Sequence, residues 1–77
     1  MLTAFWFHTD SGFGYGATAH SQRLAEEMLH AHGYPVEGER ITRVTAGVRT
    51  TDLDQNHVLP NAGPIVVNGV WFPRHNL

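Results

Sequence analysis

Six histidines and seven acidic residues supply the groups that could perform acid–base chemistry in this chain. His8, Thr9 and Asp10 directly follow an apolar segment and are the best candidates for such a group. The alternative for these residues is a polar strand end without a catalytic role. No serine lies in a nucleophile-elbow motif, and a chain of 77 residues has little room for a deep pocket beside its core. We therefore expect no enzyme and no catalytic residue.

The sequence has few of the residues and motifs that bind metals or cofactors. The chain contains no cysteine, which excludes disulfides, thiolate zinc sites and a cysteine nucleophile. All five cationic side chains are arginines, so P-loop and Schiff-base lysines are excluded as well. No His-Glu-x-x-His spacing occurs, and the histidines that could form a zinc site are scattered: His8, His20, His57 and His75. We expect no metal and no cofactor.

Residues 12–16 alternate three glycines with two aromatic side chains ahead of the clearest helical segment. Glycine lets backbone N–H groups approach an anion, and a helix N-terminus favours negative charge, so a phosphate cradle is one interpretation. The spacing lacks the third glycine of a dinucleotide-binding loop and the acidic residue about 20 positions further on. A flexible structural loop is the second interpretation. A loop that presents Phe13 and Tyr15 to a protein partner is the third.

The arginines supply a second candidate surface. Arg40, Arg43 and Arg49 lie on or beside one expected strand, where Arg43 and Arg49 share a face and Arg40 takes the other. With aromatic rings nearby, and with Arg74, they could bind RNA or single-stranded DNA. The formal net charge of −2 with neutral histidines argues against a nonspecific nucleic-acid binder. An arginine-rich protein interface and solvated charges at a sheet edge are the other interpretations.

The first elements that must position these groups are a strand and a helix. Residues 2–8 carry bulky apolar side chains on both faces, which predicts a strand that is central or covered on both sides. Residues 17–32 lack glycine, proline, valine and isoleucine, and their apolar residues recur at steps of three and four. This pattern predicts a helix capped by Thr18 or Ser21 and ended by Gly33.

The second half of the chain predicts shorter elements. Residues 39–50 show a period of two, typical of a half-buried strand, with a turn or bulge at its glycine. Residues 51–54 have the spacing of a capping box, which favours a helical turn or a plain loop. Asn68-Gly69 separates two apolar runs, which predicts a hairpin with strands at 64–67 and 70–73.

These elements predict a single α+β domain over residues 1–77. The expected architecture is a two-layer sandwich, with one main helix on an antiparallel sheet of three to five strands. Its strand–helix–strand start resembles half of a ferredoxin-like fold. A chain of this size has a thin core, so a monomer or a homodimer is expected. The apolar start lacks a basic leader and no run of 18 apolar residues occurs, so we expect a cytoplasmic protein without a membrane partner.

The whole chain resembles, in character, the small phage-encoded anti-CRISPR proteins that inhibit type I surveillance complexes. The resemblance rests on the 77-residue length from Met1, the compact α+β pattern, the absence of catalytic or cofactor motifs and the mild acidity. It implies a non-enzymatic inhibitor that binds a Cas protein in a bacterial host cell and blocks DNA recognition or nuclease recruitment. Anti-CRISPR proteins share no signature motif, so no functional residue is transferred. Many are strongly acidic and this chain is not, which favours steric or mixed-surface blocking over DNA mimicry.

The expected protein-binding surface joins the glycine-rich segment to the outer face of the helix. Aromatic residues make up 10% of the chain, and in a thin core some of them should be partly exposed, where aromatic side chains dominate binding energy. The candidate contacts are Phe13, Tyr15, Glu26, Glu27 and His30, with Asp52 and Asp54 as additional acidic contacts. The alternative function is a small nucleic-acid-binding module that uses Arg40, Arg43, Arg49 and Arg74.

Overall fold

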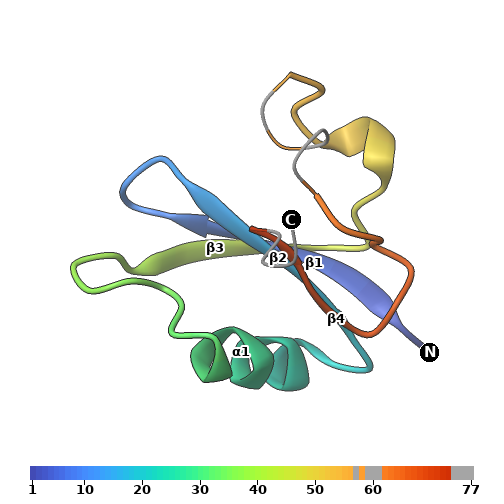
Figure 1. The fold of residues 1–77 in the computed structure, drawn as a ribbon, viewed down its shortest axis with the longest axis horizontal. Coiled ribbons are helices and arrows are strands. Elements are labelled where there is room, and N and C mark those ends of the chain that lie inside the picture. Colours follow the sequence, from blue (N-terminus) through green and yellow to red (C-terminus); the bar gives the residue numbers. More distant parts are fainter. Residues whose placement is uncertain (57, 59–61, 74–77) are drawn as a thin grey trace.

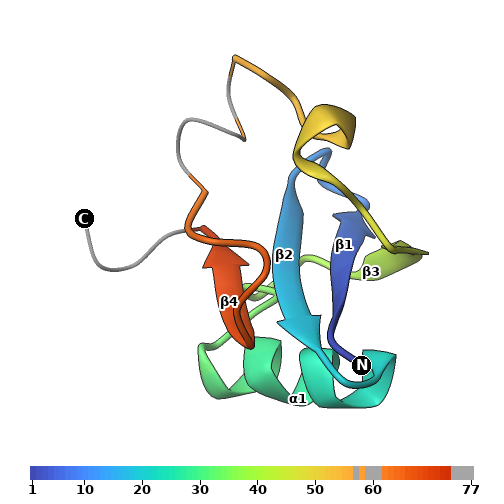
Figure 2. The ribbon, with the colours of Figure 1, turned by 90° about the vertical axis from the view of Figure 1, so that its right-hand side faces the viewer.

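A four-stranded antiparallel sheet carries one helix on one of its faces (Figure 1). The computed structural model describes residues 1–56, 58 and 62–73. Its elements are β1 (Thr3–Thr9), β2 (Gly14–Ala19), α1 (Gln22–Ala31), β3 (Ile41–Ala46), a 3-10 turn η1 (Thr50–Asp52) and β4 (Gly69–Phe72). The strand order is β3-β1-β2-β4, as Figure 2 also shows. The predicted α+β fold with one main helix on an antiparallel sheet is confirmed.

Two apolar clusters lie on opposite faces of the sheet, because successive side chains of a strand point in opposite directions. Phe5 and Phe7 of β1 belong to the first cluster, which lies against α1 and Leu29. Trp6 belongs to the second cluster, which forms around Trp71 under the segment that contains η1. Figure 1 shows α1 and this segment on opposite sides of the sheet. The prediction that residues 2–8 form a strand covered on both sides is therefore confirmed.

The helix is shorter than its sequence pattern predicts. Ser21 caps it, with its hydroxyl accepting a hydrogen bond from the Leu24 N–H at 3.2 Å. Gly33 follows the helix with a φ of +83°, a conformation that glycine adopts without strain. Residues 17–19 belong to β2 instead, because their small side chains pack inside the sheet and pair with β1.

The glycine-rich segment forms part of a strand, and the expected strand–helix–strand start is wrong. β2 begins at Gly14 and pairs with β1 as a hairpin, so the order is β1-β2-α1-β3 and the half ferredoxin-like unit does not form. Steric crowding explains why two positions of this strand are glycines. A Cβ on Gly14 would lie 2.4 Å from the indole ring of Trp6, and one on Gly16 would lie 2.4 Å from that of Trp71. Only glycine leaves room for both rings against the backbone of β2.

The expected C-terminal hairpin is also wrong. Residues 65–68 form turns and bends, and β4 pairs with β2, with Val70 opposite Ala17. Side-chain bonds fix this arrangement. The Trp71 indole N–H donates to the Thr18 hydroxyl at 3.0 Å, and that hydroxyl donates to the Ile65 carbonyl at 2.6 Å.

The segment after β3 crosses the sheet. β3 ends before Gly47, which has a φ of +70°, so the strand expected over residues 39–50 is shorter at both ends. The N–H groups of Gly47 and Val48 both donate to the Ala4 carbonyl, at 2.8 and 3.1 Å. A helical turn was one of the two alternatives for residues 51–54, and η1 is a single 3-10 turn there. No helix among the described residues is long and apolar enough to cross a membrane.

Candidate functional site

Two clefts lie on the face of the sheet opposite α1, and Gly47 and Val48 belong to the lining of both. The first, of about 380 Å³, is called the polar cleft; its lining includes Trp6, His8, Thr45, Asp52, Leu53 and Asp54. The second, of about 360 Å³, is called the apolar cleft; its lining includes Leu2, Ala4, Thr18, Ile65 and Val66. This face therefore offers two depressions of different chemistry beside each other.

His8 lies in the polar cleft beside groups from β3. Its Nε2 atom is 3.1 Å from the Thr45 hydroxyl and 3.4 Å from Nη2 of Arg43. Burial lowers the pKa of His8, and the positive charge of Arg43 lowers it further, so the imidazole is neutral at pH 7. Neither described contact is a carboxylate or a serine nucleophile, and the geometry is that of a polar strand end.

The other two acid–base candidates support the β1–β2 hairpin. The Thr9 hydroxyl donates to the Phe13 carbonyl at 2.6 Å, and it lies 2.9 Å from the Ser11 hydroxyl. The Asp10 carboxylate accepts the backbone N–H of Arg40 at 3.1 Å. These contacts tie the hairpin to the start of β3 and do not join His8 in one site.

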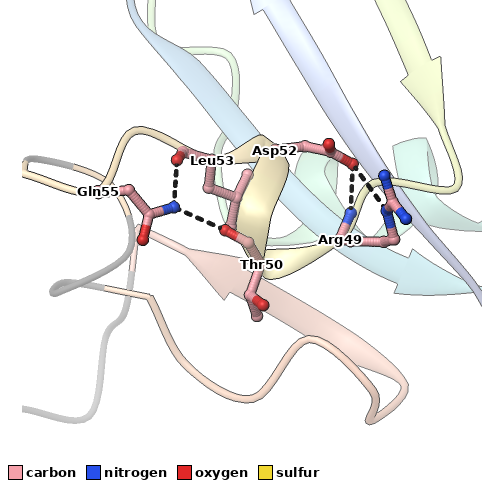
Figure 3. Close-up of polar contacts among 5 residues, drawn as sticks. All are labelled: Arg49, Thr50, Asp52, Leu53 and Gln55. Atoms are coloured by element: carbon pink, nitrogen blue, oxygen red, sulfur yellow. Dashed lines mark hydrogen bonds and ion pairs between the residues drawn. The ribbon is translucent and has the colours of Figure 1, made fainter.

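Asp52 at the end of η1 and the two residues that follow it line the polar cleft, and Figure 3 shows the polar contacts that hold this turn. Oδ2 of Asp52 accepts the Arg49 backbone N–H at 2.9 Å and lies 3.6 Å from Nε of the same arginine. The amide of Gln55 donates to the carbonyls of Thr50 and Leu53, at 2.9 and 2.7 Å. Leu53 is buried in the second cluster. The contacts of Arg49 before the turn and of Gln55 after it therefore fix the position of Asp52.

The structure divides the predicted protein-binding surface. Phe13 is 74% exposed, but Tyr15 is only 5% exposed, so the expectation that both aromatic rings are presented is wrong for Tyr15. On α1, Glu27 and His30 are exposed, and Glu27 is ion-paired with Arg23.

The acidic candidates fall on two sides of the sheet. Glu26 is half-buried on α1, whereas Asp52 and Asp54 line the polar cleft on the opposite face. The helix residues and the two aspartates cannot form one continuous surface.

The arginines do not form the expected face. Arg40, Arg43 and Arg49 are all exposed, but β3 ends at Ala46, so Arg49 shares no strand face with Arg43. Arg43 lies against His8, whereas Arg49 is ion-paired with Asp52. Arg74 lies outside the described residues.

The phosphate-cradle interpretation of residues 12–16 is wrong. Gly14 and Gly16 are buried within β2 under the two indole rings, and α1 begins only at Gln22. The glycines serve the packing of the second cluster, and the segment offers no row of open N–H groups at a helix end.

A polar network around Glu39 has no signal in the sequence, because its members are far apart along the chain. The Glu39 carboxylate accepts the Ser11 hydroxyl at 2.5 Å and also the Tyr15 hydroxyl. These hydroxyls, Ser11 first, hold the pKa of Glu39 below its ordinary value. Burial and the bond to Glu39 raise the pKa of Tyr15. The ring of Tyr15 stacks on Tyr34 with centroids 4.6 Å apart, so the network joins β2 to the connection between α1 and β3.

Within residues 1–56, 58 and 62–73, no three histidine, aspartate or glutamate side chains are grouped so that they could hold a metal ion. His57 and His75 lie outside these residues. Compared with protein-family models, curated proteins and solved structures, the chain matches none. The assignment of a site therefore depends on the geometry of the two clefts.

Proposed function

We propose that this chain is a non-enzymatic inhibitor that acts by binding another protein, in the manner of a phage anti-CRISPR protein directed at a type I Cas subunit. The observation that supports the proposal is the apolar cleft. Among the described residues, no charged side chain lines it, and Val66 in its lining is 80% exposed. A contiguous exposed apolar patch often marks a site of protein–protein interaction.

The side chains around this cleft can contribute binding energy. Val67, next to Val66, is 54% exposed and Leu2 is 38% exposed. Complete burial of a valine or leucine side chain contributes about 1.5–3 kcal/mol. Because binding buries only the exposed part of each side chain, these three residues together contribute about 3–5 kcal/mol to a complex.

The walls of the apolar cleft are fixed before a partner binds. Thr18 joins Trp71 to the Ile65 carbonyl, and Val48 is bonded to the Ala4 carbonyl. A preformed surface loses less conformational entropy on binding than a flexible one. Phe13, on the β1–β2 hairpin, offers a further exposed apolar anchor.

The test is a pull-down with the tagged protein from nuclease-treated bacterial lysate that contains type I CRISPR complexes. We expect the wild type to retain a Cas protein in stoichiometric amount. The double variant Val66→Ser/Val67→Ser should weaken retention by about tenfold or more, the effect of losing about 1.4 kcal/mol. Val36→Ser is the matched control, because Val36 is also exposed (48%) but does not line the cleft.

Either of two results would contradict the proposal: no Cas protein retained by the wild type, or equal retention by the double variant. Sedimentation of the free protein tests whether a second copy of the chain, instead of a Cas protein, covers the apolar cleft. If a second copy covers the apolar cleft, the wild type is a dimer and the double variant is a monomer.

The nucleic-acid alternative has less support from the geometry. The guanidinium group of Arg49 is already paired with Asp52, and the Asp10 carboxylate, which accepts the backbone N–H of Arg40, places a negative charge beside that arginine. A nucleic-acid module would lose its partners after nuclease treatment, and its affinity would fall steeply with salt.

A further inference from the structure

The two edges of the sheet differ in whether other backbone covers them. The edge strands are β4 and β3, which lie on opposite sides of the molecule in Figure 2. At β4, the Gly63 N–H donates to the Trp71 carbonyl at 2.7 Å, and Pro73 directly follows the strand. At β3, no described residue outside β1 forms a hydrogen bond with the backbone of the strand. The edge formed by β3 is therefore open.

The open edge presents the backbone groups of Val44 and Ala46. Just beyond β3, the Gly47 N–H donates to the Ala4 carbonyl of β1 at 2.8 Å. In an antiparallel ladder, every second residue points its N–H and C=O groups toward the same neighbouring strand. Thr45, two positions before Gly47, therefore bonds toward β1, whereas Val44 and Ala46 point their N–H and C=O groups away from the sheet.

The side chains of β3 do not block this edge. Natural edge strands are commonly protected by proline, lysine or a bulge. β3 contains no proline, the chain has no lysine, and the register of the pairing with β1 shifts only near the start of β3. Its one charged residue, Arg43, points its guanidinium group at His8, with Nη2 and Nε2 3.4 Å apart. An extended backbone can therefore reach the outward groups of β3.

We propose that β3 pairs antiparallel with β3 of a second copy of this chain, with the two Val44 residues on the twofold axis, so that the two sheets become one continuous sheet. Residues opposite each other in such a pair share a face. Val44 then contacts its counterpart on the face that carries α1, where it already packs against the first cluster. The inference goes beyond the proposed function and does not depend on it.

The sequence of β3 favours a second copy because the strand is complementary to itself in this register. Arg43 lies opposite Thr45 of the second copy, and Thr42 lies opposite Ala46, so no like charges face each other. A register centred on Arg43 would place the two arginines opposite each other. A register centred on Thr45 would pair Arg43 with Gly47, which lies outside the strand and has a φ of +70°.

Disulfide formation tests the register, because the chain has no cysteine of its own. Positions 43 and 45 of the two copies form a non-hydrogen-bonded pair with Cα atoms about 4.5 Å apart, a distance that a disulfide spans. Like positions lie about 7–8 Å apart. A mixture of the Arg43→Cys and Thr45→Cys variants should therefore form the mixed dimer about tenfold faster than either variant links to itself. Equal rates would overturn the proposed register.

The control for this experiment is Glu27→Cys. Glu27 is exposed on α1 and lies outside the edge strand. This variant should form disulfide-linked dimers only at the slow rate of random collision. Cross-linking of Glu27→Cys as fast as that of the mixture would overturn the proposal, because the disulfides would then report collisions and no β3 pairing.

Sedimentation tests the dimer without cross-linking. We expect the wild type to be a dimer that dissociates on dilution. Ala46→Pro should be a monomer, because proline removes an outward N–H group and leaves the bonds to β1 in place. Circular dichroism reports whether this variant keeps its fold, and the cysteine mixture decides the question if it does not. A wild type that is monomeric at its highest soluble concentration, or a folded Ala46→Pro dimer, would overturn the proposal.

Two further comparisons separate this dimer from the partner complex. Val66→Ser/Val67→Ser should remain a dimer, because both residues lie outside β3; a monomer would assign the dimer contact to the apolar cleft instead. A monomeric wild type that loses its pull-down partner on Ala46→Pro would assign the open edge to a strand of that partner. Because sedimentation uses no Cas protein, failure of the dimer would leave the pull-down result for the apolar cleft standing.

Discussion

The two tryptophans and the two strand glycines act as matched pairs. Trp6 occupies the space above Gly14, and Trp71 occupies the space above Gly16. Each ring therefore packs directly on the backbone of β2, and the Trp71 N–H reaches the Thr18 hydroxyl two positions further along. The glycines lower the strand propensity of β2, but they allow the largest side chains of the second cluster to pack closely.

Gly16→Ala should destabilise the fold by about 1–3 kcal/mol, the usual cost of inserting a methyl group into a packed core. The new Cβ would lie 2.4 Å from the Trp71 ring, which is bonded to Thr18 and cannot move freely. Gly63→Ala is the control, because its Cβ would meet atoms of the same tryptophan at 3.7–3.8 Å, an ordinary contact distance. Urea unfolding measures both; equal stability of the two variants would refute the steric explanation.

At the scale of elements, Glu39 links the connection after α1 to the first hairpin. Its carboxylate joins Ser11, which precedes β2, to Tyr15 within β2, and it accepts the Val36 N–H at 3.3 Å. The network holds the 34–39 segment against the sheet through the stacked rings of Tyr15 and Tyr34. A single carboxylate thus fixes the path of a long connection.

This network predicts a pH dependence of stability. The pKa of Glu39 is below its ordinary value of 4.5 in the folded protein, so its contribution is complete above pH 4.5 and is lost as the pH falls through the folded-state pKa. Glu39→Gln should therefore show a smaller loss of unfolding free energy between pH 6 and about pH 3 than the wild type. Glu37→Gln is the control, since Glu37 has no hydrogen bond to a described residue, and it should keep the wild-type dependence. A Glu39→Gln curve parallel to the wild type would exclude the network as the cause.

The elements with strong periodicity could be predicted from the sequence, and those decided by distant partners could not. β1, the Ser21 cap and β3 depend on local patterns, which the structure confirms. The expected hairpin at Asn68-Gly69 did not form, because β4 pairs with β2, whose residues lie more than fifty positions earlier in the chain. Local turn preference did not outweigh the burial of Trp71 against Gly16.

At the scale of the whole molecule, the sheet separates the exposed surface of α1 from the face that carries the two clefts. The sequence suggested one binding surface because Phe13 and the helix residues are neighbours along the chain. The structure places Asp52 and Asp54 on the face opposite α1, where they share a surface with the apolar cleft. Neither cleft could be predicted, because each combines residues from the first and the second half of the chain, with Gly47 and Val48 in both linings.

The two clusters should unfold together, because β1 supplies side chains to both. Leu29 is completely buried between α1 and the sheet, in the cluster that contains neither tryptophan. Leu29→Ala should cost about 2–5 kcal/mol, a large fraction of the stability of a small domain. Leu24→Ala on the same helix, where the side chain is 37% exposed, should cost less than about 1 kcal/mol.

The decisive comparison is between two probes of this Leu29→Ala variant. Far-ultraviolet circular dichroism follows α1, and tryptophan fluorescence follows the opposite face, where both indole rings lie. If the sheet couples the faces, both probes shift to the same lower midpoint, or both report an unfolded chain. Loss of the helix signal with native tryptophan fluorescence would show that the second cluster folds independently. In that case the two clefts would keep their shape without α1, and the helix would serve only to cover the other face.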